Sequence, residues 1–339
     1  MDSTARLQET TAAAACYRAL EESLTNVVSA FKTPYAIILS GGVDTAALLA
    51  SLRRCPSIPA PTVLVTISVD EGVAGEQPSS CEARDAIFAR EIARLLAPTV
   101  PHFVESVTKQ ELIDASRSCV EILRSYDGMQ IRNAVVPFIA MKRVLSQFPD
   151  TKAFVTGDGA DELLGGYSFF WNYESERFEA ERSQMCANWF FSTPVLADAI
   201  GCVALSPYTH PLFASWALQQ PKSACVGEAP IIVHLGDEPQ LHVTGKLCLR
   251  RAIDTPSAWR RKEPIQMGSR SEIMEHSEFW ANTCWASEQD YLRSCFAAHF
   301  PLPCNEGTVA WPCSTCGYGL SDSSQKYCRT CGAWPARTA

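Results

Sequence analysis

The chain has 339 residues, of which 47% are hydrophobic and 19% charged, and its formal net charge at pH 7 is −8. This size and composition indicate a soluble globular protein with one large domain and room for one small module. The acidic balance argues against a broad basic surface for nucleic acid, and no apolar run is long enough to cross a bilayer. The first residues lack a basic flank followed by an apolar stretch, so no secretory signal is expected.

The distribution of cysteines indicates the compartment in which the protein works. Fifteen cysteines are present, and eleven of them are scattered singly between Cys16 and Cys304. Scattered thiols in a chain without a secretory signal favour a reducing compartment, where they serve as small buried side chains. We therefore expect a cytoplasmic location.

The first half of the chain alternates between helical and strand patterns. Leu20, Leu24 and Val27 fall at helical spacing and predict a helix that ends near residue 32. Short apolar runs predict buried strands at residues 35–39, 62–68, 102–107 and 153–156. Helices are predicted between them, at residues 46–52, 82–96, 110–124 and 131–148. This alternation predicts an α/β fold with a parallel sheet covered by helices on both faces, which binds ligands at the carboxyl ends of its strands.

The second half shows no clear strand alternation. Residues 171–300 are aromatic-rich and predict a helical subdomain that closes the site, with an irregular loop at residues 221–239. A proline-rich segment follows and has the composition of a linker. The predicted organisation is an amino-terminal helix (1–32), a catalytic domain (33–300), a linker (301–312) and a small cysteine-rich module (313–339).

Two glycine-rich turns follow predicted strands. The first, SGGVDT at residues 40–45, precedes a helix, so its backbone N–H groups and the helix amino terminus suit a phosphate group. Asp44 is expected to hold Mg²⁺ that bridges the phosphates, because hard cations prefer carboxylate oxygens. The second turn, in TGDGADELLGGY at residues 156–167, places Asp158 and Asp161 three residues apart at a helix start, on one face. A divalent cation would relieve the repulsion between these acids.

Both turns resemble motifs of one family, the synthetase domain of asparagine synthetases and their relatives. The first resembles the SGGxDS loop of pyrophosphatase-type ATP-binding proteins, and the second resembles the signature SG(E/D)G(A/S)DELFGGY. Two later segments, KLCLRRA from Lys246 and WRRKEPIQMG from Trp259, resemble further family elements in the same order. The resemblance covers about residues 33–270 and implies an adenine nucleotide alpha hydrolase-like fold.

The resemblance also implies roles for individual residues. It assigns Lys262 to the reacting phosphates, where a cation stabilises the charge that develops as pyrophosphate leaves. The implied catalytic residues are Lys262 and Asp158, and the implied Mg²⁺ ligands are Asp44 and Asp161. The implied ATP-binding residues are Leu39, Ser40, Gly41, Gly42, Asp44, Thr45, Ile67, Thr156 and Gly157.

The sequence departs from the family in two places. Where the family carries G-x-E-x-R-x-P-F-L-D, this chain has Val203, Leu205 and His210 in place of the acid, the arginine and the last aspartate. This is either a paired structural exchange or the mark of a different carboxylate substrate. Only 39 residues precede Ser40, and residue 2 is Asp2 rather than the cysteine of a glutaminase domain. Ammonia, an amine, or a separate glutaminase subunit is therefore the expected nitrogen source.

The carboxyl-terminal cysteines form the pattern C-x2-C, eleven residues, C-x2-C, and a glycine follows each pair. The four residues are Cys313, Cys316, Cys328 and Cys331. Four thiolates at this spacing predict a structural zinc ribbon, because two disulfides would require an oxidising compartment. Docking, RNA contact and stabilisation of the tail remain open as its role.

Three functions compete on this sequence. The favoured one is an ATP-dependent ligase that needs Mg²⁺, activates a small-molecule carboxylate as an adenylate and forms an amide, as in asparagine biosynthesis. The second is a tRNA-modifying enzyme, because some of these also combine an SGGxDS loop with zinc knuckles, although the acidic charge argues against it. The third is a non-catalytic zinc-ribbon adaptor, which the intact Asp44, Asp161 and Lys262 disfavour.

Overall fold

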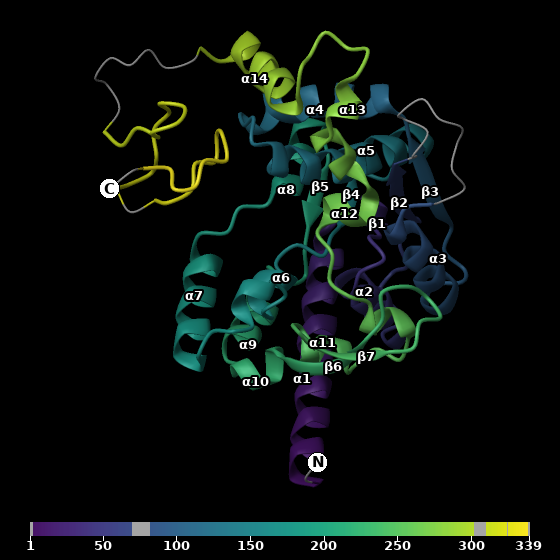
Figure 1. The fold of residues 1–339 in the computed structure, drawn as a ribbon. Helices are drawn as coiled ribbons and strands as arrows, with labels where there is room; N and C mark the ends of the chain where they lie inside the picture. The colour runs from purple at the N-terminus through teal and green to yellow at the C-terminus, as the bar shows by residue number, and fades with distance from the viewer. Residues whose placement is uncertain (1–2, 70–81, 302–309, 324, 338–339) are drawn as a thin grey trace.

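The computed structural model describes residues 3–69, 82–301, 310–323 and 325–337, with side chains from residue 11 onward. A twisted sheet lies at the centre of the molecule between two groups of helices (Figure 1). A long first helix runs along one side, and the cysteine-rich segment lies at the periphery. None of the helices in the described ranges is long and apolar enough to span a membrane.

The sheet has five parallel strands in the order β3-β2-β1-β4-β5. Every residue of β2 is buried, and Ala36 of β1 lies opposite both Val63 and Phe154. The strands are β1 (Tyr35–Ile38), β2 (Val63–Val69), β3 (His102–Val107), β4 (Ala153–Val155) and β5 (Val203–Leu205). The four strands predicted from apolar runs are confirmed, because short continuous apolar runs are what a parallel sheet covered on both faces requires.

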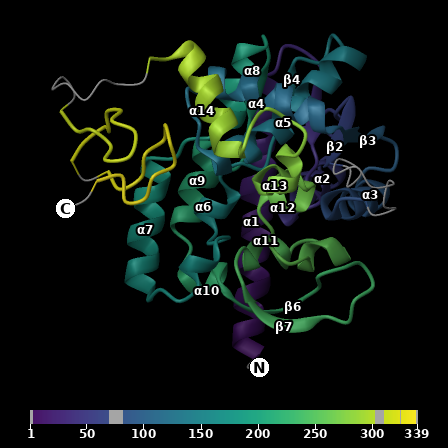
Figure 2. The same cartoon turned by 45° about the horizontal axis from the view of Figure 1, so that its top comes forward.

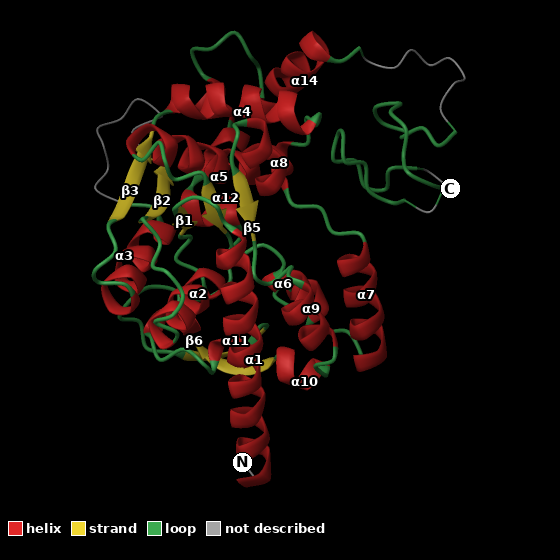
Figure 3. Ribbon diagram, turned by 180° about the vertical axis from the view of Figure 1, so that it is seen from behind, coloured by secondary structure: helices red, strands yellow, loops and turns green. Residues whose placement is uncertain are grey.

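Helices cover both faces of this sheet, as predicted. Ala36 and Ile37 of β1 point to opposite faces and join two different hydrophobic clusters. The cluster around Ile37 includes helices α1 (Ser3–Ala30), α2 (Val43–Arg54) and α3 (Arg84–Leu96). The cluster around Ala36 includes α4 (Lys109–Leu123), α5 (Gly128–Gln147), α8 (Ser192–Ala199) and α14 (Glu288–His299). Figure 3 shows the two layers from behind.

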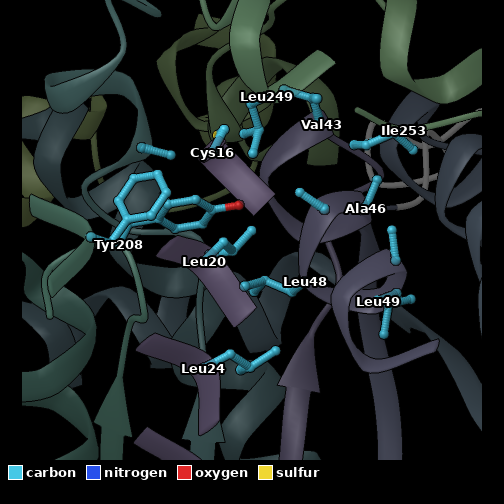
Figure 4. Close-up of a cluster of buried hydrophobic side chains, with 14 of the residues drawn as sticks. Cys16, Leu20, Leu24, Val43, Ala46, Leu48, Leu49, Tyr208, Leu249 and Ile253 are labelled. Atoms are coloured by element: carbon cyan, nitrogen blue, oxygen red, sulfur yellow. The ribbon is translucent and has the colours of Figure 1, made fainter. Parts of the chain in front are cut away.

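The amino-terminal helix is built into the main core. Cys16, Leu20 and Leu24 lie on one face of α1, fully buried against α2 (Figure 4). Burying a leucine side chain contributes about 1.5–3 kcal/mol, so this face of α1 adds substantially to the free energy of unfolding. The aromatic ring of Tyr208 closes the same cluster from the far side.

The prediction for residues 171–300 was partly wrong, because strands occur there. β5 forms the edge of the main sheet. β6 (Gly227–Ile231) lies within the segment expected to be an irregular loop and pairs antiparallel with β7 (Gln240–Thr244), which directly follows that segment. β5 is three residues long and β6 contains Pro230, so neither shows a strand pattern in the sequence. Figure 2 shows the hairpin on the side of α1 and α11. The other helical segments are α6 (Ala160–Leu163), η2 (Ser168–Phe170), α7 (Ser175–Ala187), α9 (Pro211–Leu218), α10 (Lys222–Cys225), α11 (Leu247–Arg250), η3 (Pro256–Trp259), α12 (Ile265–Ser269), η4 (Ser271–Glu275) and α13 (Ser277–Trp280).

Candidate active site

The two glycine turns lie side by side at the carboxyl ends of adjacent strands. β1 leads into the first turn and β4 into the second, and these strands are neighbours in the sheet. The strand order reverses between β1 and β4, because β2 and β3 lie beyond β1 on one side and β5 lies beyond β4 on the other. Parallel sheets of this kind bind ligands at such a switch point. The turns are in contact, because a Cβ atom on Gly157 would lie 3.0 Å from Cβ of Asp44.

The first turn requires glycine at position 41. Gly41 has φ of 68°, and a Cβ atom there would overlap the backbone carbonyl of Asp85. The hydroxyl groups of Ser40 and Thr45 lie 3.4 Å apart across the turn, and α2 begins directly after Gly42. This leaves a polar turn at the amino terminus of a twelve-residue helix, an arrangement that suits an anion.

A cluster of two acids and two lysines joins the turns. Asp44 follows the first turn, Asp161 lies on α6 after the second, and the ammonium group of Lys246 lies between them. Lys246 Nζ is 2.7 Å from both carboxylate oxygens of Asp44 and 2.7 Å from Oδ1 of Asp161. Lys262 Nζ lies 2.8 Å from Oδ2 of the same Asp161. The site therefore holds two carboxylates around one buried cation, with a second cation at its edge.

Electrostatic interactions keep Asp161 and Lys262 of this cluster charged. Burial would raise the pKa of Asp161, but the ammonium groups of Lys246 and Lys262 outweigh it and hold that pKa well below its usual range. Burial would likewise lower the pKa of Lys262, but Asp161 and then Asp44 outweigh it and raise that pKa. Asp161 is thus ionised and Lys262 protonated at neutral pH.

Asp158 lies apart from the lysines. Its Oδ2 accepts a hydrogen bond from the Thr156 hydroxyl at 2.9 Å, and its carbonyl accepts one from Ser206 at 2.6 Å. Burial raises its pKa, while hydrogen bonds from Thr156 and Thr193 oppose the shift. The expectation that Asp158 and Asp161 share a helical face was wrong, because α6 begins at Ala160 and Asp158 lies in the preceding turn.

The structure also locates the remaining predicted ATP-binding residues. Leu39 directly follows β1 and Ile67 lies within β2; both are buried, and the Leu39 carbonyl accepts a hydrogen bond from the Thr66 hydroxyl at 2.7 Å. These two residues lie in different hydrophobic clusters. The turn residues and the acid–lysine cluster thus come together at the carboxyl ends of β1 and β4, whereas Leu39 and Ile67 are buried within the sheet.

Sequence reasoning gave no role to Lys246 or Arg260. Lys246 has a left-handed backbone with φ of 62° at the start of α11, and its side chain is 2% exposed. Arg260 pairs with the buried Asp85 at 2.7 Å and donates to the Ser40 carbonyl at 3.3 Å. Both residues stood within segments that matched family elements, so their place in an ordered motif was the signal that could have identified them.

The positions that depart from the family lie beside the second turn. Val203 and Leu205 of β5 are 42% and 37% exposed, and the Leu205 carbonyl accepts a hydrogen bond from the Thr156 backbone at 3.1 Å. His210 caps α9 through its ring nitrogen, which accepts from the Leu212 backbone. Two apolar side chains are therefore exposed where the family signature has an acid and an arginine.

The four tail cysteines converge. Their sulfur atoms all lie within 4.8 Å of one another, with 3.8 Å between Cys313 and Cys331 and 3.6 Å between Cys316 and Cys328. Tetrahedral zinc with Zn–S bonds of about 2.3 Å requires S–S separations of about 3.8 Å. The donor set and its spacing therefore fit one zinc ion.

The sequence is similar to those of known proteins. The family model for asparagine synthase matches residues 16–228. A probable glutamine-hydrolysing asparagine synthetase of Schizosaccharomyces pombe is 24% identical over 337 residues, covering 83% of this chain and 55% of that protein. Asparagine synthetase B of Escherichia coli is 24% identical over 338 residues, with coverage of 88% and 56%. The chain therefore spans about half the length of these curated relatives.

Proposed function

The chain belongs to the asparagine synthase family, and from this premise we propose that its two-turn site converts a carboxylate to an acyl-adenylate and then to an amide. The observation that carries the proposal is the cluster of Asp44, Lys246, Asp161 and Lys262 between the two turns. A buried pair of acids with two lysines at a helix amino terminus suits a polyphosphate that arrives with a cation.

The geometry of the first turn supports the proposed roles in ATP binding. The N–H groups of the first turn and the start of α2 receive phosphate, with the hydroxyl groups of Ser40 and Thr45 beside them. Thr156 and Gly157 are the proposed adenosine contacts from the second turn, and the buried Leu39 and Ile67 are proposed to contribute through their backbone and apolar groups. A carboxylate oxygen of the substrate attacks the α-phosphorus, the α–β bridging bond breaks, and pyrophosphate leaves beside Lys262.

The acids fit a magnesium ion as well as a lysine. Asp44 and Asp161 direct carboxylate oxygens at the ammonium group of Lys246, and carboxylate oxygens are the ligands that Mg²⁺ prefers, so the two acids would hold Mg²⁺ beside this lysine. Bound there, Mg²⁺ would neutralise phosphate charge. Asp158, whose pKa burial raises, is the proposed acceptor for the proton released when the nitrogen attacks the acyl carbon and AMP departs.

Product analysis tests the proposal. With ATP, Mg²⁺ and a panel of carboxylates, the protein should form AMP and pyrophosphate and catalyse carboxylate-dependent exchange of labelled pyrophosphate into ATP. This is expected because attack at the α-phosphorus makes pyrophosphate the leaving group. Formation of ADP and phosphate would contradict adenylation.

We further propose that the nitrogen arrives as ammonia or as an amine, or from a separate glutaminase subunit. A glutaminase nucleophile must be a reactive thiolate. Burial instead raises the pKa of the Cys55, Cys186 and Cys202 thiols.

The 13 cysteines in the described part of the chain are all free thiols, which supports a reducing compartment such as the cytoplasm.

Isotope labelling distinguishes these sources. Purified protein given ¹⁵N-amide glutamine without ammonia should yield no labelled product, whereas ¹⁵N-ammonium should label it at a rate that rises with pH. The rise is expected because only neutral ammonia has a lone pair to attack the adenylate. Labelled product from glutamine at a rate comparable to that from ammonia would overturn the proposal.

A further inference from the structure

The cysteine-rich tail docks directly on the segment that starts α5. The backbone N–H of Tyr126 donates to the Thr330 carbonyl at 2.7 Å, and the Ser125 hydroxyl donates to the Arg329 carbonyl at 2.7 Å. Ser125 and Tyr126 are 1% and 4% exposed, so these hydrogen bonds are shielded from water. A buried backbone group that loses such a partner is left unsatisfied, which is energetically costly, so this contact stabilises the docked tail.

The two accepting carbonyls lie inside one cysteine pair. Arg329 and Thr330 are the two residues between Cys328 and Cys331, so a metal held by these cysteines fixes the turn that presents both carbonyls. Gly332 follows with φ of 80°, and a Cβ atom there would lie 2.6 Å from Oδ1 of Asp127. The second cysteine pair is therefore shaped for close contact with residues 125–127.

A side-chain hydrogen bond reinforces this contact. The hydroxyl of Tyr327 donates to Oδ2 of Asp127, while Oδ1 of Asp127 accepts the backbone N–H of Met129 and caps α5. One oxygen of the Asp127 carboxylate therefore binds the tail, and the other caps α5. Tyr318 provides a comparison within the tail, because its hydroxyl donates to the Pro301 carbonyl rather than to Asp127.

The tail also contacts the segment that leads into α8. Arg329 donates to the Asn188 carbonyl at 3.2 Å, and its guanidinium lies 5.1 Å from the centre of the Phe190 ring. Four residues after Asn188 the chain enters α8, where Thr193 hydrogen-bonds Asp158 of the second turn. One arginine of the tail therefore holds the connection to an acid of the proposed active site.

The first turns of α5 also contact the segment that follows Lys262 in the sequence. Asn133 accepts the backbone N–H of Gln266 at 3.3 Å, and the Arg132 carbonyl accepts the Ser271 hydroxyl at 2.8 Å. Gln266 lies on α12, four residues after Lys262. The tail, the start of α5 and the lysine segment form a continuous set of contacts.

We propose that a thiophilic metal in the four-cysteine site is a positioning element of the synthetase site. It fixes the turn at residues 328–331, and this turn sets the start of α5 and the entry to α8, which contact the segments that carry Lys262 and Asp158. This inference rests on the proposed function for its kinetic consequences only. The metal takes no part in the chemistry, and Tyr327 is a positioning residue.

The test compares Tyr327→Phe with Tyr318→Phe in the full chain. Both keep the four cysteines, so both should retain one zinc per chain by metal analysis. Tyr327→Phe should speed hydrogen exchange of the backbone amides at residues 125–135. It should also lower kcat/KM for the carboxylate about tenfold while the KM for ATP stays nearly unchanged, because a small displacement of α5 and α8 would shift the reacting groups out of their productive geometry. Tyr318→Phe should match the wild type in both measurements. Zinc removal from the wild type by chelation should produce the same exchange pattern more strongly, and added zinc should reverse it.

The outcomes separate the two proposals. Unchanged exchange at residues 125–135 in Tyr327→Phe and in the chelated protein would overturn the positioning role. A wild type that exchanges no pyrophosphate with any carboxylate would instead refute the proposed function, and the hydrogen-exchange comparison would still decide the positioning role.

Discussion

Replacement of Asp161 by asparagine is expected to lower the turnover number of carboxylate-dependent AMP formation by about 10³-fold or more. Asp161 contacts both Lys246 and Lys262 and is one of two acids proposed to hold Mg²⁺. A cation that neutralises developing phosphate charge is worth several kcal/mol, and each 1.4 kcal/mol is about tenfold in rate. Initial rates measured over a range of Mg²⁺ concentrations provide the check.

The neighbouring acid supplies the matched control for this substitution. Glu162 accepts a hydrogen bond from the Tyr167 hydroxyl at 2.8 Å rather than from a lysine, and burial raises its pKa. Glu162→Gln retains an oxygen for Tyr167 and should keep most of the rate. Circular dichroism should show that both variants are folded. Full turnover in folded Asp161→Asn would disprove the metal assignment.

Replacement of Lys262 by alanine is expected to reduce the turnover number by about 10²–10³-fold, the usual effect of removing one group that stabilises transition-state charge. Lys262 is 27% exposed at its side chain and held by a single acid, so its ammonium group can follow the departing pyrophosphate. The dissociation constant for ATP, measured by calorimetry, should change much less than turnover, because the contact strengthens mainly as the bond breaks.

A substitution at Arg261 tests whether turnover depends on the position of Lys262 or only on the total positive charge of residues 260–262. Arg261 is exposed and directly precedes Lys262, so Arg261→Ala removes one positive charge from the same surface without touching Asp161. This variant should retain wild-type turnover. Equal losses in both variants, or weaker ATP binding with unchanged turnover in Lys262→Ala, would show that the lysine is a ground-state contact.

Local sequence was sufficient to predict the part of the fold that carries the glycine turns. β1, β2 and β4 are buried on both faces, and their apolar runs are visible without knowledge of their neighbours. Gly41 was predictable for a related reason, because a left-handed turn before a helix requires glycine locally. The resemblance to the family elements then predicted that Asp44 and Asp161 hold one metal ion.

Long-range contacts set the features that sequence reasoning missed. Lys246 meets Asp44 across 202 positions, and its left-handed backbone has no local signature in a lysine. Among the described strands, β5 pairs only with β4. Its exposed Val203 and Leu205 flank a single buried residue, so the strand is too short to show an amphipathic pattern. The spacing of the tail cysteines predicted a metal site but carried no information about Ser125 or Asn188, which the tail contacts.

The docked tail has a consequence for protein synthesis in the cell. Ser125 leaves the ribosome long before Arg329, its partner 204 positions later in the chain. At about 5–20 residues per second, translation of the intervening sequence takes roughly 10–40 s. During that interval the sheet and α5 of the nascent chain can assemble, while the capping segment at residues 125–127 has neither the tail carbonyls nor the Tyr327 hydroxyl. Maturation of this part of the molecule is therefore expected to wait until the tail has been translated and, under the proposed metal binding, until its four cysteines have taken up metal.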